Sequence, residues 1–526
     1  MFLTSLLNPF LESYHVVEQK EPRYLEAKQL FEESAFLNIS LYCFIVFKFF
    51  TGFLVARFLG PTLYGVRTVF GLVTEYQYFS HLGTFDAARR EVPYLRGNKE
   101  DKNALIILSN VFTINIVYSL VFLVVMIFAA VIMYKERFDS VYIDFALFLG
   151  VYCFFEKLST FYSIKLAVDK RSNIVSRSRI LSGFSYALFC IVLTYFFSLR
   201  GLFIGLLASS ILVTIYMHMK IREIPTLQIS IRVTLDLLKI GFPIMMILLM
   251  FIIMRSVDRI IIAAMLTEQM LGYFAIGTIV SGLVYSTIAD IAKIIFGPRI
   301  MEKLGQTGDL QQVKIYFIEP TIIVAYCTPY LAGVLFLGIS FPIKYFLPDY
   351  IPAIGVVQIL VLGAFFISIS TMATMICVSI NKQIKIVFLF LAAILINAIL
   401  SFLFLYFGWG ISGVAVGTGF SYFVLSFISI LFTLKQFHAE VRESIGFLAI
   451  VYAPFFYCIF LVFVLDEIFS TGIKSIWEDL WYTGLKILTF IIGFSLIFIF
   501  MRKQIAIKKF FSSLPLKHLK TLASSS

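Results

Sequence analysis

Charged residues stand within long apolar stretches of this sequence, and their types and spacing suit the binding of an anion. Asp258 and Arg259 lie three and four residues after Arg255. On a helix, one carboxylate can then pair with either guanidinium, and a net positive charge remains. Arg67 and Glu75 share one face of another predicted helix. Together these residues predict a cationic site for an anion such as phosphate or pyrophosphate.

The charged side chains inside the apolar stretches comprise eight basic and five acidic residues. Each is costly in hydrocarbon and tends to face a helix-bundle interior or a wet cavity. Lys48, Glu75 and Arg255 lie deepest and are the strongest cavity candidates. Arg57 is nine residues from Lys48, about half a turn around a helix, so the two cannot line one surface. The candidates for coupling to protons or sodium are Glu75, Glu156, Asp258 and Asp290.

Several of these residues have a purely structural alternative. The long side chains of Arg57, Arg67 and Arg259 could reach a membrane interface. Asp290 could form a simple ion pair with Lys293, three residues later. Sequence alone leaves both readings open at these positions.

The elements that position these residues are transmembrane helices. The chain has 526 residues, of which 60% are hydrophobic and 14% charged, and its mean hydropathy is +0.94. A soluble domain carries about 25% charged residues, and about 20 apolar residues suffice for a helix to span a bilayer. We therefore expect an all-α polytopic membrane protein with fourteen spans, at 37–58, 63–83, 104–133, 141–164, 176–197, 201–217, 240–264, 270–296, 318–341, 352–380, 386–407, 410–434, 446–465 and 483–501.

The cysteines do not form a metal-binding or disulfide pattern. All six fall inside predicted spans, without CxxC or Cys/His spacing. We expect no metal site, no catalytic residues and no cofactor.

The distribution of the net charge of +12 indicates how the chain is oriented in the membrane, and does not indicate a nucleic-acid partner. If the N-terminus is cytoplasmic, 30 of the 43 Lys and Arg residues fall on the cytoplasmic side and five on the other. This bias follows the positive-inside rule. Both termini are therefore expected in the cytoplasm, and the protein in the cytoplasmic (inner) membrane.

Glycine landmarks recur through the chain at an offset of 207 or 208 residues. The three pairs are Gly65 and Gly272, Gly97 and Gly305, and Gly205 and Gly413. A period this constant indicates one half-molecule copied end to end. Six spans per copy predict two pseudo-symmetric lobes with a substrate path between them.

The expected organisation has six parts. They are an amphipathic N-terminal arm (1–36), an N-lobe (37–222), a cytoplasmic linker (223–239), a C-lobe (240–434), two further spans (435–501) and a basic cytoplasmic tail (502–526).

Short motifs resemble one transporter family. The run Val55 to Pro61, followed by Tyr64-Gly65, is similar to the first-span signature of polysaccharide and O-antigen flippases. These flippases belong to the multidrug/oligosaccharidyl-lipid/polysaccharide exporter (MOP) superfamily. The second-lobe motifs Lys239 to Pro243, Asp258-Arg259 and Leu271 to Tyr273 are also similar. The resemblance covers about residues 37–435, and the long N-terminal arm departs from it.

This resemblance implies a flippase that works by alternating access. It would move a polyprenyl-pyrophosphate-linked oligosaccharide across the cytoplasmic membrane during synthesis of a surface polysaccharide such as O-antigen or lipopolysaccharide. Its partners would be lipids, and also a polysaccharide polymerase and glycosyltransferases. The cycle would be driven by protons, sodium or the membrane potential. The residues expected to hold the pyrophosphate are Lys48, Arg57, Arg67, Arg255 and Arg259.

Three alternatives stay open. A multidrug-and-toxin (MATE-type) cation antiporter shares the fold, but cationic drugs favour acidic cavities. A membrane-embedded sugar polymerase or ligase would need a large outer loop, and the longest outer loop expected here is about 466–482. The third is a lipid scramblase or a scaffold, and a test for energy dependence would separate it from a transporter.

Overall fold

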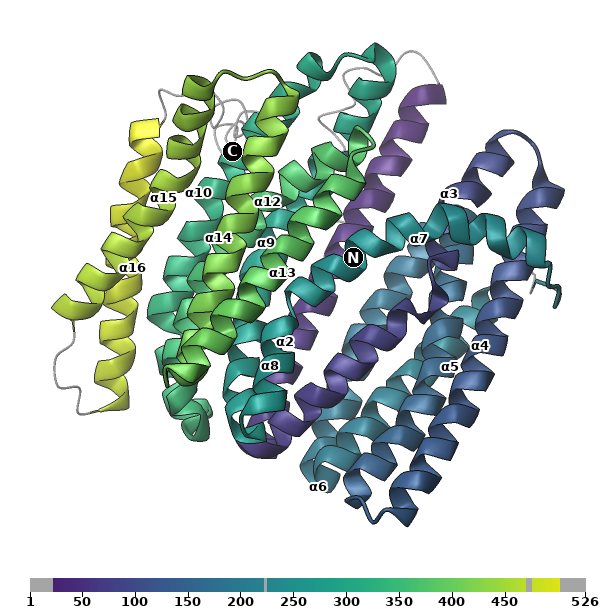
Figure 1. The fold of residues 1–526 in the computed structure, drawn as a ribbon, viewed down its shortest axis with the longest axis horizontal. Helices are drawn as coiled ribbons and strands as arrows, with labels where there is room; N and C mark the ends of the chain where they lie inside the picture. Colours follow the sequence, from purple (N-terminus) through teal and green to yellow (C-terminus); the bar gives the residue numbers. More distant parts are fainter. Residues whose placement is uncertain (1–21, 222–224, 470–474, 502–526) are drawn as a thin grey trace, which may run out of the picture.

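The computed structural model describes residues 22–221, 225–469 and 475–501, which are almost entirely helical and contain no β-strand (Figure 1). Within these ranges, eleven helices are long and apolar enough to cross a membrane. Two of them, α2 (Pro22–Gln77) and α6 (Ser172–Lys220), each hold two predicted spans, and α5 (Ser140–Val168) adds one more. The prediction of an all-α membrane protein with about fourteen spans is confirmed. Most of the predicted arm and all of the basic tail lie outside the described residues.

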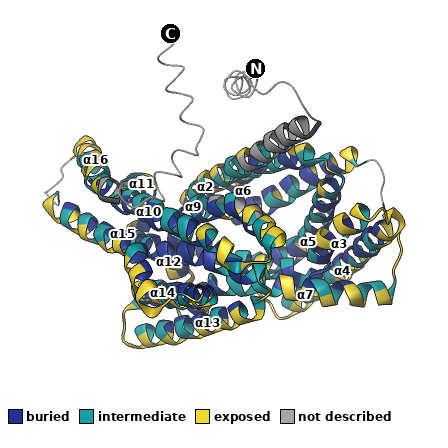
Figure 2. Cartoon of the chain, turned by 90° about the horizontal axis from the view of Figure 1, so that it is seen from above, coloured by how far each residue is buried: buried dark blue, intermediate teal, exposed yellow. Residues whose placement is uncertain are grey.

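The helices form two lobes that lie side by side when viewed from above (Figure 2). The first lobe contains α2, η2 (Tyr78–His81), α3 (Thr84–Gly97), α4 (Asp101–Lys135), α5 and α6. The second contains α7 (Ile231–Met254), α8 (Val257–Met265), α9 (Glu268–Thr307), η3 (Leu310–Val313), α10 (Lys314–Gly338), α11 (Ser340–Phe346), η4 (Pro348–Ala353), α12 (Ile354–Ser379), α13 (Gln383–Tyr406) and α14 (Gly410–Gln436). The last two helices, α15 (Val441–Ile468) and α16 (Ile476–Met501), pack against α10.

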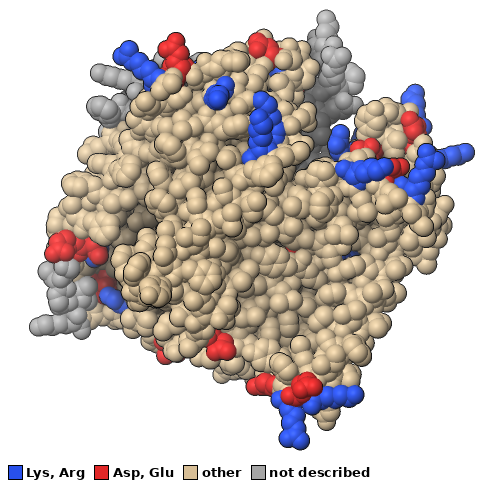
Figure 3. Space-filling view, in the orientation of Figure 1, with Lys and Arg blue, Asp and Glu red and all other residues tan. Residues whose placement is uncertain are grey.

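Charged side chains gather toward the two ends of the molecule. On the face shown in Figure 3, a broad band with very few charged atoms separates these ends. Such a band is what a hydrocarbon layer about 30 Å thick requires of the helices that cross it.

Two long helices change direction at a single residue. In α2 the break is Gly60, with φ 69° and ψ 172°. Only glycine adopts this backbone conformation readily, and the following Pro61 suits the start of a new helix because it lacks an N–H. The two halves of α2 therefore form a V (Figure 1). In α6 the break is Ser198, with φ 53° and ψ −136°.

The predicted seventh span, 240–264, is two helices rather than one. Helix α7 begins at Ile231, inside the predicted linker, and ends at Met254, whereas α8 begins at Val257. Because α7 packs on α3 of the first lobe and on α13 of the second, it passes from one lobe to the other. The break between α7 and α8 places Arg255, Asp258 and Arg259 at a helix junction.

The repeat predicted from glycine spacing reappears as a reciprocal contact between the lobes. A β-carbon at Gly65 would lie 1.7 Å from the Glu268 carbonyl oxygen, and one at Gly272 would lie 1.9 Å from the Pro61 carbonyl oxygen. Pro61 and Glu268 are themselves 207 residues apart. One contact is thus made twice across a pseudo-twofold axis, and glycine is needed on both sides because the backbones touch.

An apolar core closes the same end of the molecule. It unites Tyr64 of α2 with Phe274 of α9 and Tyr350 of η4, all nearly inaccessible to solvent. The Tyr350 hydroxyl donates a hydrogen bond of 3.0 Å to the Ala56 carbonyl oxygen in the first lobe. The lobes are therefore packed together at this end, which is the end predicted to face outward.

We expect Gly65→Ala and Gly272→Ala each to destabilise the protein, because an added methyl group would force the two backbones apart. Overpacking of this kind costs about 1–3 kcal/mol. The matched control is Gly71→Ala, since a β-carbon there meets nothing within 4 Å. Thermal unfolding in detergent measures the effect, and the double variant should lose less than the sum of the two single losses because both act on one contact. Equal melting temperatures for Gly272→Ala and Gly71→Ala would contradict the reciprocal contact.

Candidate functional site

A cavity of about 440 Å³ lies between the two lobes. Its wall combines residues of α2 and α6 from the first lobe with residues of α8, α9, α12 and α14 from the second. The charged lining residues are Lys48, Arg67, Glu75, Arg255, Asp258 and Arg259. Tertiary structure thus collects charges from both halves of α2 and from the α7–α8 junction. With both carboxylates ionised, the cavity carries two net positive charges.

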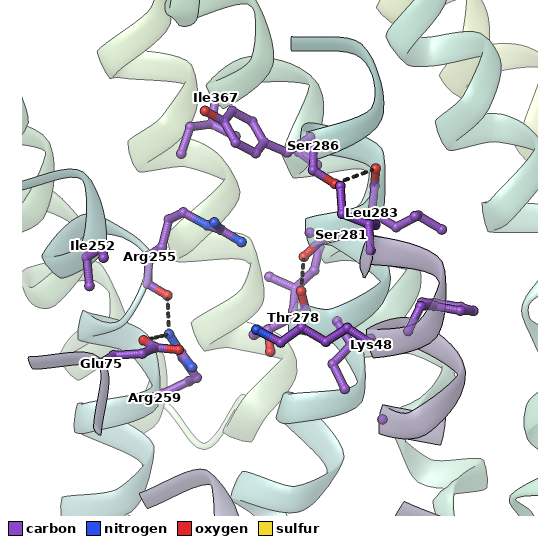
Figure 4. A pocket seen from close by; sticks show the side chains of 18 of the residues that line it. Lys48, Glu75, Ile252, Arg255, Arg259, Thr278, Ser281, Leu283, Ser286 and Ile367 are labelled. Carbon is purple, nitrogen blue, oxygen red and sulfur yellow. Dashed lines mark hydrogen bonds and ion pairs between the residues drawn. The ribbon is translucent and has the colours of Figure 1, made fainter. Parts of the chain in front are cut away.

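Three of the four cations have no carboxylate partner. Among the described residues, Lys48, Arg67 and Arg255 make no ion pair. Figure 4 shows Lys48 and Arg255 extending into the cavity from opposite walls. Arg67 and Arg255 both repel the charge of Lys48, and Glu75 attracts it, so that repulsion comes from two groups and attraction from one. Because like charges repel most strongly away from bulk water, this arrangement favours an anion bound among them.

Aromatic rings hold the guanidinium groups without neutralising them. The guanidinium of Arg255 lies 5.5 Å from the Tyr285 ring centre and 5.6 Å from that of Phe251. Arg67 lies 5.3 Å from the ring of Tyr64. Cation–π contacts of this kind contribute about 0.5–2 kcal/mol each. They orient the two arginines without a carboxylate partner, and the Tyr186 hydroxyl is hydrogen-bonded to Arg67 as well.

The fourth cation links the two lobes. Arg259 of α8 forms an ion pair of 3.2 Å with Glu75 of α2 and donates a second hydrogen bond, also 3.2 Å, to the Arg255 carbonyl oxygen (Figure 4). Next to this pair, the Tyr76 hydroxyl is hydrogen-bonded to the Ser256 hydroxyl. Neighbouring residues on α2 thus contact neighbouring residues at the α7–α8 junction.

Asp258 has a local structural role. It is 1% exposed, and its two carboxylate oxygens accept hydrogen bonds from the Arg259 N–H at 2.7 Å and the Thr418 hydroxyl at 3.2 Å. The carboxylate lies in the first turn of α8, where the helix dipole favours negative charge. Asp258 therefore fixes the start of α8, which carries Arg259 into the cavity.

Three of the predicted site residues lie outside the cavity. Arg57 is exposed at a different level of α2. Asp290 forms the ion pair with Lys293 that its spacing allows, at 3.3 Å. Glu156 lies inside the first lobe, where one carboxylate oxygen accepts a hydrogen bond of 3.1 Å from Thr160 and the other is buried without a partner.

The second predicted span, 63–83, ends earlier than expected. Helix α2 stops at Gln77, so Arg67 and Glu75 reach the cavity while Tyr78 and His81 turn into the first lobe. There the ammonium group of Lys157, 1% exposed, donates to the backbone carbonyl oxygens of Gln77 and Tyr78. This lysine therefore supplies hydrogen bonds to carbonyl groups at the end of α2, which have no partner within the helix.

Sequence reasoning missed the uncharged part of the cavity. Hydroxyl groups in the lining come from Tyr186, Thr278, Ser281, Tyr285, Ser286, Thr418 and Tyr422. Three of these, Thr278, Ser281 and Tyr285, lie at i, i+3 and i+7 on α9, a spacing that predicts one polar face. That spacing was the signal available in the sequence.

The profile of a family described as polysaccharide biosynthesis proteins matches residues 54–337, more than half of the chain. The chain belongs to this family. No curated protein sequence matches it.

Two solved structures share the fold of this polysaccharide biosynthesis family member. Lipid II flippase MurJ, in an inward closed conformation, is 17% identical with a TM-score of 0.66, over 89% of this chain and 99% of that chain. An inward-facing multidrug resistance MATE family transporter of the MOP superfamily is 12% identical with a TM-score of 0.64, over 75% and 94% of the two chains. The predicted membership of a polysaccharide family is confirmed, and the chain has the fold of these two solved proteins, one a flippase and the other a transporter.

We expect Glu75→Gln to loosen the contact between the lobes, because it removes the charge that pairs with Arg259. The pair is partly exposed, so the coupling should be about 0.5–1 kcal/mol. Spin labels on exposed Val124 of α4 and Ile399 of α13 would report the distance between the lobes, and the longer-distance population should grow about two- to fivefold. Asp290→Asn, which breaks a pair within one helix, is the control and should leave the distribution unchanged. An identical response of the two variants would refute the cross-lobe role of Glu75.

Proposed function

We propose that this transporter is a flippase that moves a polyprenyl-pyrophosphate-linked oligosaccharide across the cytoplasmic membrane for surface polysaccharide synthesis. The observation that carries this proposal is the group of three cations, Lys48, Arg67 and Arg255, which face the cavity without carboxylate partners. Pyrophosphate supplies two or more negative charges and several acceptor oxygens. Arginine matches phosphate geometry with parallel N–H donors, so the arrangement suits such a head group.

The rest of the cavity suits sugar. Hydroxyl groups of Tyr186, Tyr285 and Ser286 line it beside the cations. Hydroxyl side chains can both donate and accept, as the hydroxyl groups of a sugar require. A volume of about 440 Å³ lies within the usual range for small-ligand sites. The cavity would hold the pyrophosphate and the first sugar residues, while the remainder of the oligosaccharide extends out of the cavity.

The ion pair between Glu75 and Arg259 offers a route from binding to movement. A pyrophosphate in the cavity would compete with Glu75 for the Arg259 guanidinium, and so weaken a contact between the lobes. Moving the anion toward a positive outside is favoured by about 2.3 kcal/mol per charge per 100 mV. The alternative source of energy is a proton or sodium gradient, which would act through binding of the ion at Glu75, Glu156, Asp258 or Asp290. The proposed partners in the pathway are a polysaccharide polymerase and glycosyltransferases.

The second candidate, a MATE-type cation antiporter, is disfavoured by the cavity charge. A cationic drug would meet four basic side chains and only two acidic ones, one of which already pairs with Arg259. Like charges at close range in a low-dielectric site repel by several kcal/mol.

Charge reversal of Arg67 and Arg255 together, as R67E/R255E, should abolish flipping of labelled lipid-linked oligosaccharide in proteoliposomes. We expect a loss of at least about 100-fold, because each reversal replaces an attraction for the pyrophosphate with a repulsion. The control R57E changes an exposed arginine outside the cavity and should retain activity. Melting temperatures identify any variant that fails to fold. If the double variant folds and flips the substrate at the wild-type rate, the cavity is excluded as the pyrophosphate site. Efflux of a cationic dye by the wild-type protein would favour the antiporter.

A further inference from the structure

A second hollow, an apolar groove, adjoins the charged cavity. It has a volume of about 680 Å³ and opens on one side. Its lining comes from the second half of α2, from α4 and α5 in the first lobe, and from α8 in the second. Val73 and Phe122 represent the first lobe in this lining, and Ile260, Ala263 and Ala264 the second.

The groove and the cavity lie on two sides of the same pair of helices. Glu75 and Arg259 line the cavity, and the residues that follow them, Tyr76 and Ile260, line the groove. The ion pair Glu75–Arg259 and the hydrogen bond between Tyr76 and Ser256 therefore stand at the boundary between a charged space and an apolar one.

The open surface of the groove is apolar, as a surface in contact with hydrocarbon requires. The side chains of Val73 and Ile260 are each about 42% exposed in the groove. Both belong to helices in the membrane-spanning part of the chain, where exposed apolar side chains are expected to contact lipid. Tyr76 and Gln77 are the polar side chains of the described lining, and they direct hydrogen bonds to Ser256 and Cys153. What remains open is apolar surface.

We infer that this groove seats the isoprenoid chain next to the pyrophosphate of the substrate while the cavity holds the charged head. This inference rests on the proposed function. An amphiphile bound by its pyrophosphate cannot place its hydrocarbon among four cations and two carboxylates, because burying charge against hydrocarbon is costly. It needs an apolar path that begins beside the charged site and opens to lipid.

Small side chains keep the groove open for a hydrocarbon chain. Ala263 and Ala264 are small residues on successive positions of α8, where larger side chains would fill the space between α8 and α4. Hydrocarbon leaving the bilayer for a protein groove gains little from the hydrophobic effect, so shape and close packing decide what fits. The Glu75–Arg259 and Tyr76–Ser256 contacts would have to separate for the chain to pass between the lobes.

The test uses the full-length protein in nanodiscs and a polyprenyl pyrophosphate that carries a photoreactive group near its head. Irradiation should label α8 and α4 in the wild-type protein. Ala264→Trp should reduce this labelling, and the flipping rate, at least tenfold, while binding of inorganic pyrophosphate changes less than twofold. The matched control is Val124→Trp, because Val124 of α4 is 66% exposed and lies outside the groove lining. Ala264→Leu provides a milder filling variant if the tryptophan variant does not fold.

The outcomes separate the two proposals. If the wild-type protein binds pyrophosphate but the probe does not label α8 or α4, the groove assignment is overturned and the proposed function stands. If a phospholipid with the same photoreactive group labels the groove equally well, the groove holds ordinary membrane lipid and the inference is also overturned. If the wild-type protein binds neither inorganic pyrophosphate nor the polyprenyl probe, the proposed function fails, and the inference fails with it.

Discussion

The structure depends on positive charge that is kept unneutralised inside a membrane protein. Lys48, Arg67 and Arg255 project into one cavity, and no carboxylate of the described residues pairs with them. Such an arrangement is stable only where water or a ligand solvates the charges, because isolated charges in hydrocarbon are strongly disfavoured. The hollow between the lobes, the hydroxyl groups in its wall and the aromatic rings beside the arginines all serve this requirement.

The cavity lies between the two pseudo-symmetric lobes, and contacts between the same two lobes close one end of the molecule. The reciprocal contacts of Gly65 and Gly272 bring backbone against backbone, and an apolar core with Tyr64 and Tyr350 surrounds them. A contact repeated across a pseudo-twofold axis can act as a pivot, because a rotation about that axis changes both halves alike. The cross-lobe link of Glu75 and Arg259 is different in kind. It is polar, partly exposed and adjacent to the cavity proposed for the pyrophosphate, where a bound anion would compete with Glu75 for Arg259.

The broken helix α7–α8 connects these features. It crosses from the first lobe to the second, and its break presents Arg255 and Arg259 to the cavity while Ile260 faces the apolar groove. Asp258 holds the start of α8 in place through the Arg259 N–H and the Thr418 hydroxyl. One helix junction therefore borders both the charged and the apolar space, which is what an amphiphilic substrate would require.

The amino-acid sequence by itself determined the class, the number of spans, the repeat and the cationic character of the site. Apolar run length and glycine spacing are local properties, and Arg67 and Glu75 could be assigned to one face from helical periodicity alone. Tertiary structure decided which charges meet. It brought Lys48 and Arg67 together from the two halves of α2, left Arg57 exposed and enclosed Glu156 within the first lobe. Periodicity predicts which residues share one face of a helix, but not which helix packs against that face. The break between Met254 and Val257 and the early end of α2 at Gln77 also change which residues share a face. The groove beside Tyr76 and Ile260 could be found only from coordinates, because it lies between helices of the first lobe and α8 of the second, which is far from them along the chain.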